Sequence, residues 1–492
     1  MTMSYHFLHK SYKTSNLILT AGVIILAIFI GSKIPTLSDI ISKIFYTALN
    51  SELGGRFEAL TLLTIIPIFA ITWLWLLFIK KDYLKVLLLQ IMAFPFTYKA
   101  ASAFAVLAYD PGFGGTAQKV SITTFLLIAL FCALVFLKVI KRPKNKEWRL
   151  FEKLLLIYAT FLTFSQFFNH SFHSAIWLSI GGIWQFVFLF YMLSSIIKSD
   201  DDIILLVKAL LVFVVINIVM RYFSEEQVLV QELGSGFIRV GAGAMGPAVS
   251  YGGYLAIMIT LTIALYRIKN SVIYLAAALL FFVELLNTFT RGGFLILFIL
   301  LIIPLWKSER KFFRKIALFI LPMLIVFGQT IWKYASFRGL SLDPKDLASL
   351  TNRWNLVINY LSDNLSFNFI GNGIGNLTPI WNGSRYYPAH NITIALIDQT
   401  GIIVTILFML LLVYSALIAL RKSKYYATTN KEGVTLCLFI FVALLQWVVF
   451  ANTTSTLLNY YYPYEASSIF WIILFLPSVI HSYSCGTVSN KK

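Results

Sequence analysis

Residues 335–401 read ASFRGLSLDPKDLASLTNRWNLVINYLSDNLSFNFIGNGIGNLTPIWNGSRYYPAHNITIALIDQTG, and they hold the longest polar stretch of an otherwise apolar chain. A loop longer than about 15 residues is usually functional or disordered. Disordered segments are poor in bulky apolar residues. Residues 335–389 are not poor in them, since they include Trp354, Phe367, Phe369, Ile370, Trp381, Tyr386 and Tyr387. We therefore expect 335–389 to form a folded loop between two hydrophobic segments.

The composition around this loop is that of a membrane protein. The 492 residues are 59% hydrophobic and 12% charged, with a mean hydropathy of +0.80, whereas soluble domains carry about 25% charged residues. Apolar runs long enough to cross a bilayer as helices, about 18 residues or more, recur along the chain. The sequence predicts an all-α polytopic membrane protein with about 14 (12–14) transmembrane helices.

The apolar runs also give the individual spans and a division of the chain. The predicted spans are residues 16–36, 59–80, 83–106, 121–140, 150–169, 173–197, 203–222, 247–266, 271–289, 291–306, 313–333, 390–420, 434–451 and 467–482. We divide the chain into N-terminal transmembrane helices (1–222), a membrane domain that includes the loop 335–389 (223–482) and a tail (483–492). The three cysteines, Cys132, Cys437 and Cys485, form no disulfide or metal-binding pattern.

The basic residues set the orientation of these spans. The net charge is +19, but Lys and Arg gather in short loops, where they fix topology and meet anionic lipid headgroups, so nucleic acid is not an expected partner. The basic clusters fall on one side together with both termini, and we assign this side to the cytoplasm: 80–81, 138–149, 267–269, 307–315 and 421–431. The opposite loops are poor in basic residues: 37–58, 107–120, 223–246, 335–389 and 452–466. Arg239, Arg291, Arg353 and His390 then lie on one outer face.

Thr290, Arg291, Gly292 and Gly293 form a TRGG sequence between two apolar runs. An arginine there is costly unless it stays hydrated or binds an anion, and neighbouring glycines let backbone and ligand approach closely. The alternative is an arginine whose head group reaches the lipid headgroups.

Two further arginines are candidate anion-binding residues. Arg239 lies in GSGFIRVGAGAMGPA (234–248), a small-residue segment suited to close contact with a polar headgroup. Arg353 opens an amphipathic segment, TNRWNLVINYL (351–361), which Asn352 or Thr351 can cap. An anion bound there would use both the arginine and the free N–H groups of the first turn. The alternative for both is an ordinary hydrated loop charge.

His390 is the candidate general base. It precedes an apolar run at the outer boundary, and the unperturbed pKa of imidazole suits proton transfer near neutral pH. The alternative is a histidine that only forms structural hydrogen bonds. Lys99 and Glu284 are charges within predicted spans and therefore also functional candidates, which pair with one another or act separately.

Two other polar patterns are weaker evidence for a functional site. His170 and His173 share an outer turn, but no carboxylate or cysteine nearby completes a metal-ligand set. The glycines of GNGIGN (371–376) follow no predicted strand and open no helix, so they indicate a tight turn rather than a nucleotide-binding loop.

These motifs together resemble the O-antigen ligase and O-antigen polymerase family of bacterial envelope proteins. The similar parts are TRGG at 290–293, Arg353 with its following tryptophan, GNGIGN, and His390-Asn391 followed after nine residues by Gly401. The resemblance covers roughly 230–420. The ligase pattern ends in a small residue or Tyr three positions after the glycine, where this chain has Val404. Together with fourteen spans rather than twelve, this favours a polymerase-like relative.

The resemblance implies a glycosyltransferase at the periplasmic face of the inner membrane. The donor would be a glycan on undecaprenyl diphosphate, and the acceptor a sugar hydroxyl of a growing glycan or of the lipid A core. His390 would be the general base, with Asn391, Thr290 and Gly292 in supporting roles. The diphosphate would be held by Arg291, Arg353 and Arg239, because arginine binds phosphate at two points. Transfer would invert the anomeric configuration. No carboxylate cluster for Mg²⁺ is evident on the outer face, so we expect no metal and no cofactor.

The competing hypothesis is a lipid-linked oligosaccharide flippase or other transporter. Such proteins also have twelve or fourteen spans, but internal repeats, interrupted helices and short outer loops are typical of them. The long loop 335–389 favours the enzyme.

Overall fold

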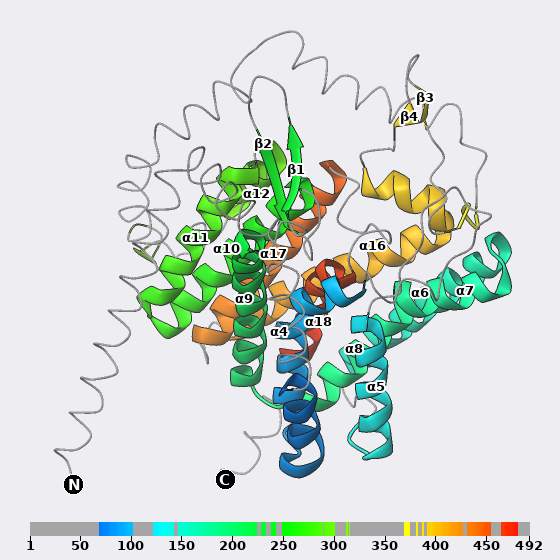
Figure 1. Ribbon diagram of the computed structural model, residues 1–492, viewed down its shortest axis with the longest axis horizontal. Coiled ribbons are helices and arrows are strands. Elements are labelled where there is room, and N and C mark those ends of the chain that lie inside the picture. Colours follow the sequence, from blue (N-terminus) through cyan, green and yellow to red (C-terminus); the bar gives the residue numbers. More distant parts are fainter. Residues whose placement is uncertain are drawn as a thin grey trace, which may run out of the picture.

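A computed structural model shows a bundle of helices with two short β-hairpins (Figure 1). It describes residues 68–101, 122–141, 146–223, 228–232, 238–242, 248–288, 290–300, 311–312, 314, 369–373, 380–381, 386–387, 391–426, 431–453 and 464–480. The predicted spans 16–36 and 313–333 lie outside these residues, as does most of the loop 335–389.

The α-helices of the described residues keep close to the predicted spans. Their bounds are α4 Tyr83–Ala101, α5 Ile122–Phe136, α6 Lys146–Asn169, α7 Phe172–Ser179, α8 Gln185–Ile196, α9 Asp200–Phe223, α10 Ala248–Lys269, α11 Val272–Thr288, α12 Arg291–Leu297, α16 Ile392–Tyr426, α17 Lys431–Thr453 and α18 Tyr464–Val479. Two π-helical segments, η1 Trp75–Lys80 and η3 Ile180–Trp184, precede α4 and join α7 to α8.

Five helices among the described residues are long and apolar enough to cross a membrane: Trp148–Asn169, Asp200–Val219, Ser250–Lys269, Ile392–Tyr426 and Glu432–Asn452. Six shorter apolar helices accompany them, from Ile68–Lys80 to Ser468–Val479. Several helices of this kind are what a membrane protein requires. The number of about fourteen spans stays a prediction.

The helix ends follow local sequence signals. Ser199 and Asp202 form a reciprocal cap at the start of α9: Ser199 Oγ accepts a hydrogen bond from the backbone N–H group of Asp202 (3.2 Å), and Asp202 Oδ2 accepts from the backbone N–H groups of Lys198 (2.7 Å) and Ser199 (2.9 Å). Three aspartates in the first turn of α9 complement the helix dipole. Asn270 ends α10 in the left-handed conformation, with φ of 48°, as asparagine does at helix C-termini.

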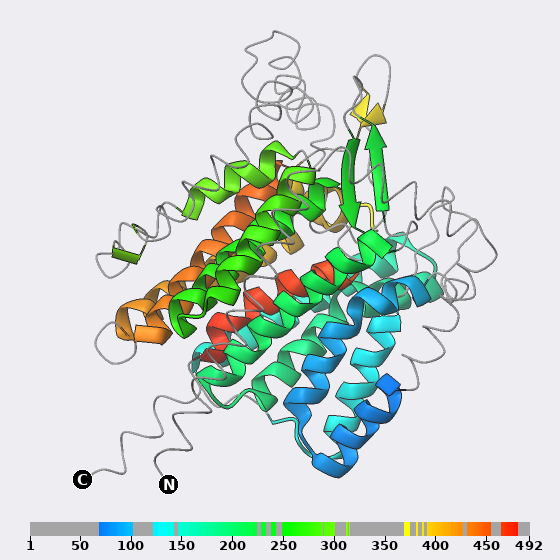
Figure 2. The same ribbon diagram turned by 60° about the vertical axis from the view of Figure 1, so that its left-hand side comes forward.

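Helix α18 lies at the centre of the bundle and carries much of the core. It contacts α4, α5, α6, α8, α16 and α17 (Figures 1 and 2). The ring of Phe470 stacks on Trp447 of α17 with 3.9 Å between centroids, and Trp471 stacks on Phe186 of α8 at 5.0 Å. Both tryptophans are at most 2% exposed. Large stacked rings therefore join the N-terminal helices to α16 and α17.

Contacts between helix ends sort the bundle into two ends. At the first, here called the basic end, Lys269 Nζ lies 3.3 Å from Asp201 Oδ1 and 3.9 Å from Glu432 Oε2. The other end, here called the distal end, contains Arg221, Tyr251, Thr288, Asn391 and Asn452. The basic cluster 267–269 ends α10 at this end, and the cluster 421–424 lies in the last turns of α16, shortly before α17 begins at Lys431. The orientation of the spans stays a prediction.

Two antiparallel hairpins lie in loops expected on the outer side. β1 Val228–Glu232 pairs with β2 Ile238–Ala242, and β3 Ile380–Trp381 pairs with β4 Tyr386–Tyr387. The strands β1 and β2 stand beside the distal ends of α9, α10 and α11 (Figure 2). The prediction of an all-α chain holds for the bundle, and these short strands, which contain Val, Ile, Trp and Tyr, are an addition to it.

Candidate functional site

The TRGG sequence begins in the short connection between α11 and α12 and continues into the first turn of α12 at the distal end; we call it the TRGG turn. Thr290 is buried, and its Oγ1 lies 2.8 Å from Thr288 Oγ1. A Cβ atom at Gly252 of α10 would lie only 2.1 Å from Thr290 Oγ1. The missing side chain at position 252 therefore lets α10 pack directly against this turn.

The predicted anion-binding residue of this turn, Arg291, is the first residue of α12. Gly292 follows it and is partly buried. The side chain of Arg291 lies outside the described part of the structure. The position of its backbone is nevertheless fixed, because Thr290 contacts both α10 and the end of α11.

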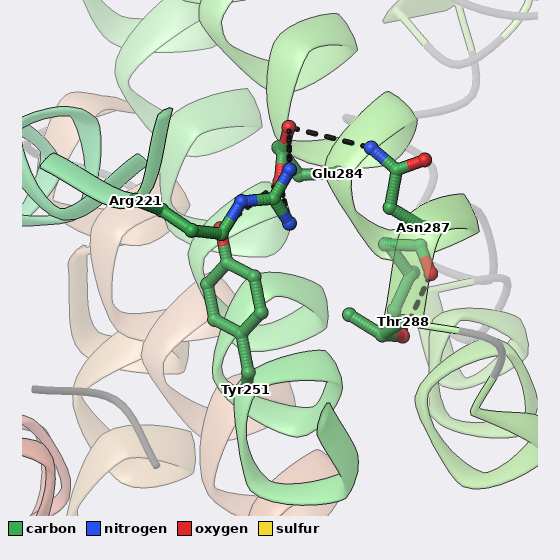
Figure 3. A network of polar contacts seen from close by, with 6 residues as sticks. Arg221, Tyr251, Glu284, Asn287 and Thr288 are labelled. Atoms are coloured by element: carbon green, nitrogen blue, oxygen red, sulfur yellow. Dashed lines mark hydrogen bonds and ion pairs between the residues drawn. The ribbon is translucent and has the colours of Figure 1, made fainter. Parts of the chain in front are cut away.

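A buried ion pair lies one helical turn before this turn (Figure 3). Arg221 Nη1 is 2.9 Å from Glu284 Oε2, and Arg221 Nη2 is 3.3 Å from Glu284 Oε1. The Tyr251 hydroxyl donates to Glu284 Oε2 (3.3 Å), and Asn287 Nδ2 donates to Glu284 Oε1 (3.5 Å). Glu284 is therefore paired with Arg221 rather than left alone in the bundle. The side chain of Lys99, its other considered partner, is outside the described residues.

Asn391, which follows His390, caps the N-terminus of α16. Its Oδ1 accepts hydrogen bonds from the backbone N–H groups of Thr393 (2.9 Å) and Ile394 (3.2 Å). Its Nδ2 donates to the backbone oxygen of Asn452 (3.3 Å), and Thr393 Oγ1 donates to Asn452 Oδ1 (2.7 Å). The start of α16 is thus attached to the last turn of α17.

Helix α16 is interrupted at Gly401, the glycine of the family pattern. Its φ of 84° and ψ of 166° are outside the helical region, and a positive φ of this kind favours glycine. The residues 392–400 form a short half-helix here, and residues 402–426 form the rest of α16. A side chain at position 401 would also meet the oxygen of Phe369, 2.2 Å from its Cβ.

Residues 369–373 of the long loop fill this interruption. The backbone N–H groups of Asn372 and Gly373 donate to the oxygens of Asp398 (2.7 Å) and Gln399 (2.9 Å). Carbonyls that lose helical partners at a break need other donors, and the loop supplies them. Asn372 Nδ2 also donates to Asp398 Oδ1 (2.8 Å). Gly371 and Gly373 have positive φ values of 77° and 91°, a conformation that favours glycine; the predicted tight turn over 371–376 extends beyond the described residues.

The same loop segment is attached to α6. Ser165 Oγ donates to the oxygen of Ile370 (2.5 Å), and Asn169 Nδ2 donates to the oxygen of Gly371 (3.0 Å). The half-helix 392–400 is therefore held at its start by α17 and at its end by the loop and α6. We call residues 369–373 with Asp398 the latch.

Helix α10 links the TRGG turn to α17. Gly252 of α10 packs against Thr290, and a Cβ atom at the next residue, Gly253, would lie 2.2 Å from Phe450 of α17. Asn452, two residues further along α17, binds Asn391. The His-Asn motif is therefore attached directly to the last turn of α17, and the TRGG turn is connected to the same turn through α10.

The other predicted site residues are placed less fully. Arg239 lies in β2 opposite Gln231 of β1, and its side chain is outside the described part. Arg353 and His390 lie outside the described residues. No group of three or more His, Cys, Asp or Glu side chains within the described residues is arranged to hold a metal ion.

Sequence reasoning missed the residues that support the motifs. Arg221 stands at the end of an apolar run, where an interfacial charge is ordinary, and its partner is 63 residues away. Asp398, Ser165 and Asn169 are polar residues within apolar runs, which is the one signal that singles them out.

The fold and these contacts define the described part of the chain as a helical bundle that contains helices long and apolar enough to cross a membrane, with the TRGG turn and the start of α16 at one end. Comparison with protein-family models, with curated proteins and with solved structures finds no match for the chain.

Proposed function

We infer that the protein transfers a glycan from undecaprenyl diphosphate to a sugar hydroxyl at the periplasmic face of the inner membrane, as an O-antigen ligase or polymerase does. The observation that carries this proposal is that both motifs are linked to the last turn of α17, the TRGG turn through α10 and the His-Asn motif directly. Gly252 and Gly253 of α10 pack on Thr290 and on Phe450, and Asn391 binds Asn452. Arg291 and His390 each adjoin one of these anchored positions.

The proposed reaction needs an anion site beside a base. The acceptor hydroxyl oxygen attacks the anomeric carbon, and His390 takes the hydroxyl proton. The bond between that carbon and the diphosphate oxygen breaks, and undecaprenyl diphosphate leaves with the electron pair. Arg291, Arg353 and Arg239 stabilise the negative charge that develops on this leaving group, because guanidinium stays charged and binds phosphate at two points. Attack from the opposite side inverts the anomeric configuration.

Fixed donors are useful in such a reaction because they need not reorganise as charge develops. The buried Thr290 and the cap formed by Asn391 give both motifs rigid backbones. These features support the transfer reaction over a loose loop that only covers the membrane surface.

The experiment is reconstitution of the purified protein with an undecaprenyl-diphosphate-linked glycan and an acceptor glycan. We expect a longer or newly linked glycan, formed equally well with excess chelator. A strict Mg²⁺ requirement would argue against arginines acting in place of a metal. In cells that lack the protein, long glycans on the carrier lipid indicate a missing ligase, and surface glycans capped with a single repeat indicate a missing polymerase.

A transporter of lipid-linked oligosaccharides is the second candidate. The observation in its favour is the interruption of α16 at Gly401, because interrupted helices line substrate sites in many transporters. The same reconstitution separates the two: a transporter moves the donor across the bilayer and leaves its glycosyl–phosphate bond intact.

A further inference from the structure

A buried ion pair connects three helices at the distal end, and the proposed reaction makes no use of it. Arg221 of α9 meets both carboxylate oxygens of Glu284 of α11, at 2.9 and 3.3 Å. Tyr251 of α10 donates its hydroxyl to the same carboxylate at 3.3 Å. Arg221 is 5% exposed and Glu284 is 0% exposed. Figure 3 shows these side chains converging on the Glu284 carboxylate.

Neither topology nor stability accounts for this pair. Charges that fix topology lie at the basic end, whereas Arg221 is at the distal end and is neutralised by Glu284. Apolar residues of similar volume often replace a buried ion pair with no loss of stability. An arginine that contacts both oxygens of a carboxylate fixes the relative orientation of the two side chains, however, whereas apolar contacts are not directional. The pair therefore fixes how α11 is rotated against α9.

The rotation of α11 determines where the TRGG turn lies. Glu284 precedes Thr288 by one helical turn, and Thr288 Oγ1 lies 2.8 Å from Thr290 Oγ1. Thr290 is packed against Gly252 with no space for an added Cβ. A change in the angle of α11 therefore moves Thr290 and the backbone of Arg291, which follows it directly.

We propose that Arg221 and Glu284 are positioning residues that hold Arg291 in place for the donor diphosphate. This inference rests on the proposed function. It also assigns a role in the site to the N-terminal helices (1–222), which contribute Arg221, although the resemblance to a known family starts only near residue 230.

The test compares four variants in purified protein. The double variant R221M/E284L replaces the pair with apolar residues of similar size, and E284Q keeps the shape of Glu284 while removing its charge. R291K is the reference for a weakened diphosphate contact. E152Q is the matched control, because Glu152 is also a buried carboxylate that accepts a hydrogen bond from a tyrosine, Tyr191 (2.6 Å), but it lies between α6 and α8.

The measurements are the donor kinetics (KM and kcat), the hydrogen–deuterium exchange of residues 286–294 and, as a check on folding, the melting temperature. For R221M/E284L we expect a melting temperature close to that of the unmodified protein, faster exchange at 286–294, and a kcat/KM for the donor lowered about 10- to 100-fold, mainly through KM. E284Q should change exchange and KM in the same direction. R291K should raise KM without altering exchange, and E152Q should alter neither.

The outcomes separate this inference from the proposed function. Unchanged exchange at 286–294 in both R221M/E284L and E284Q overturns the positioning role, and so does faster exchange with an unchanged donor KM. If the unmodified protein transfers no glycan, the proposed function fails, and binding of undecaprenyl diphosphate replaces KM as the measured quantity. Weaker binding together with faster exchange then still supports the positioning role.

Discussion

Asn391 uses both ends of its side-chain amide in structural hydrogen bonds, and it directly follows the proposed general base His390. Its oxygen caps α16 through Thr393 and Ile394, and its nitrogen binds Asn452. The proposed general base must lie within hydrogen-bond reach of the acceptor hydroxyl, and a fixed cap at the next residue would favour this.

Substitution of His390 tests whether it accepts a proton or only forms hydrogen bonds. Glutamine can keep one hydrogen bond but does not accept a proton at a useful pH. We expect H390A and H390Q to insert normally, to keep donor binding and to lose about 10²- to 10⁴-fold in kcat. His481, which the sequence places at the basic end, is the matched control, and H481A should retain full activity. Transfer near the normal rate in H390Q would make His390 structural.

The half-helix 392–400 is the start of α16, and the latch holds its end. The half-helix contains nine residues, fewer than the roughly 12 that a helix needs for stability on its own. Its stability therefore depends on its attachments, which are Asn452 at one end and Asn372 with Gly373 at the other. Loosening one attachment should affect the neighbouring motif without unfolding the bundle.

Exchanging the side chains of Asn372 and Asp398, which bind one another within the latch, tests this dependence. Asn372 donates to Asp398 at 2.8 Å, so N372D places two carboxylates together, which repel. We expect N372D to lower kcat, by up to about 100-fold for a displacement near 1 Å, with the donor KM little changed. The double variant N372D/D398N restores one donor and one acceptor and should recover most of kcat.

The control for the exchange is S415A, since Ser415 donates from the continuous part of α16 to the oxygen of Leu474 (2.6 Å). Its loss should leave kcat unchanged. Equal activity of N372D and the unmodified protein would mean that the latch has no part in placing the His-Asn motif.

The sequence predicts elements of this bundle well where a single apolar run makes a single helix. The spans 247–266, 271–289 and 434–451 correspond to α10, α11 and α17 within a few residues. The interruption of α16 was missed, because Gly401 stands within a continuous apolar run and the donors that satisfy the break come from a loop 26 residues before their acceptors.

The sequence predicted the motifs of the candidate site but not the residues that bind and position them. TRGG and His-Asn are visible as short patterns, and the structure gathers both at the distal end. The pairing of Arg221 with Glu284 depends on how α9 and α11 pack, which residue type and spacing do not reveal. Glu284 was recognisable as a costly buried charge, whereas its partner was not.

At the scale of the whole described bundle, the exposed ion pairs of Lys269 and the sequence motifs lie at opposite ends. Lys269, Asp201 and Glu432 meet at the basic end. The TRGG turn, the start of α16 and the hairpin β1–β2 lie at the distal end (Figure 2). Under the rule that basic loops stay in the cytoplasm, we expect the distal end and the loop 335–389 to face the exterior.

Labelling of single cysteines tests this orientation. After replacement of Cys132, Cys437 and Cys485, a cysteine is introduced either at Ser349 in the long loop or at Tyr425 near the end of α16, where the side chain is 58% exposed. An impermeant thiol reagent added to intact spheroplasts should label S349C and leave Y425C unlabelled until the membrane is permeabilised. Ser349 precedes α16 in the sequence and Tyr425 lies near its end. If α16 crosses the membrane, the two cysteines report on opposite sides of it. The reverse pattern would place the TRGG turn and the His-Asn motif on the cytoplasmic side, away from a donor presented at the periplasmic face. That result would contradict the proposed reaction.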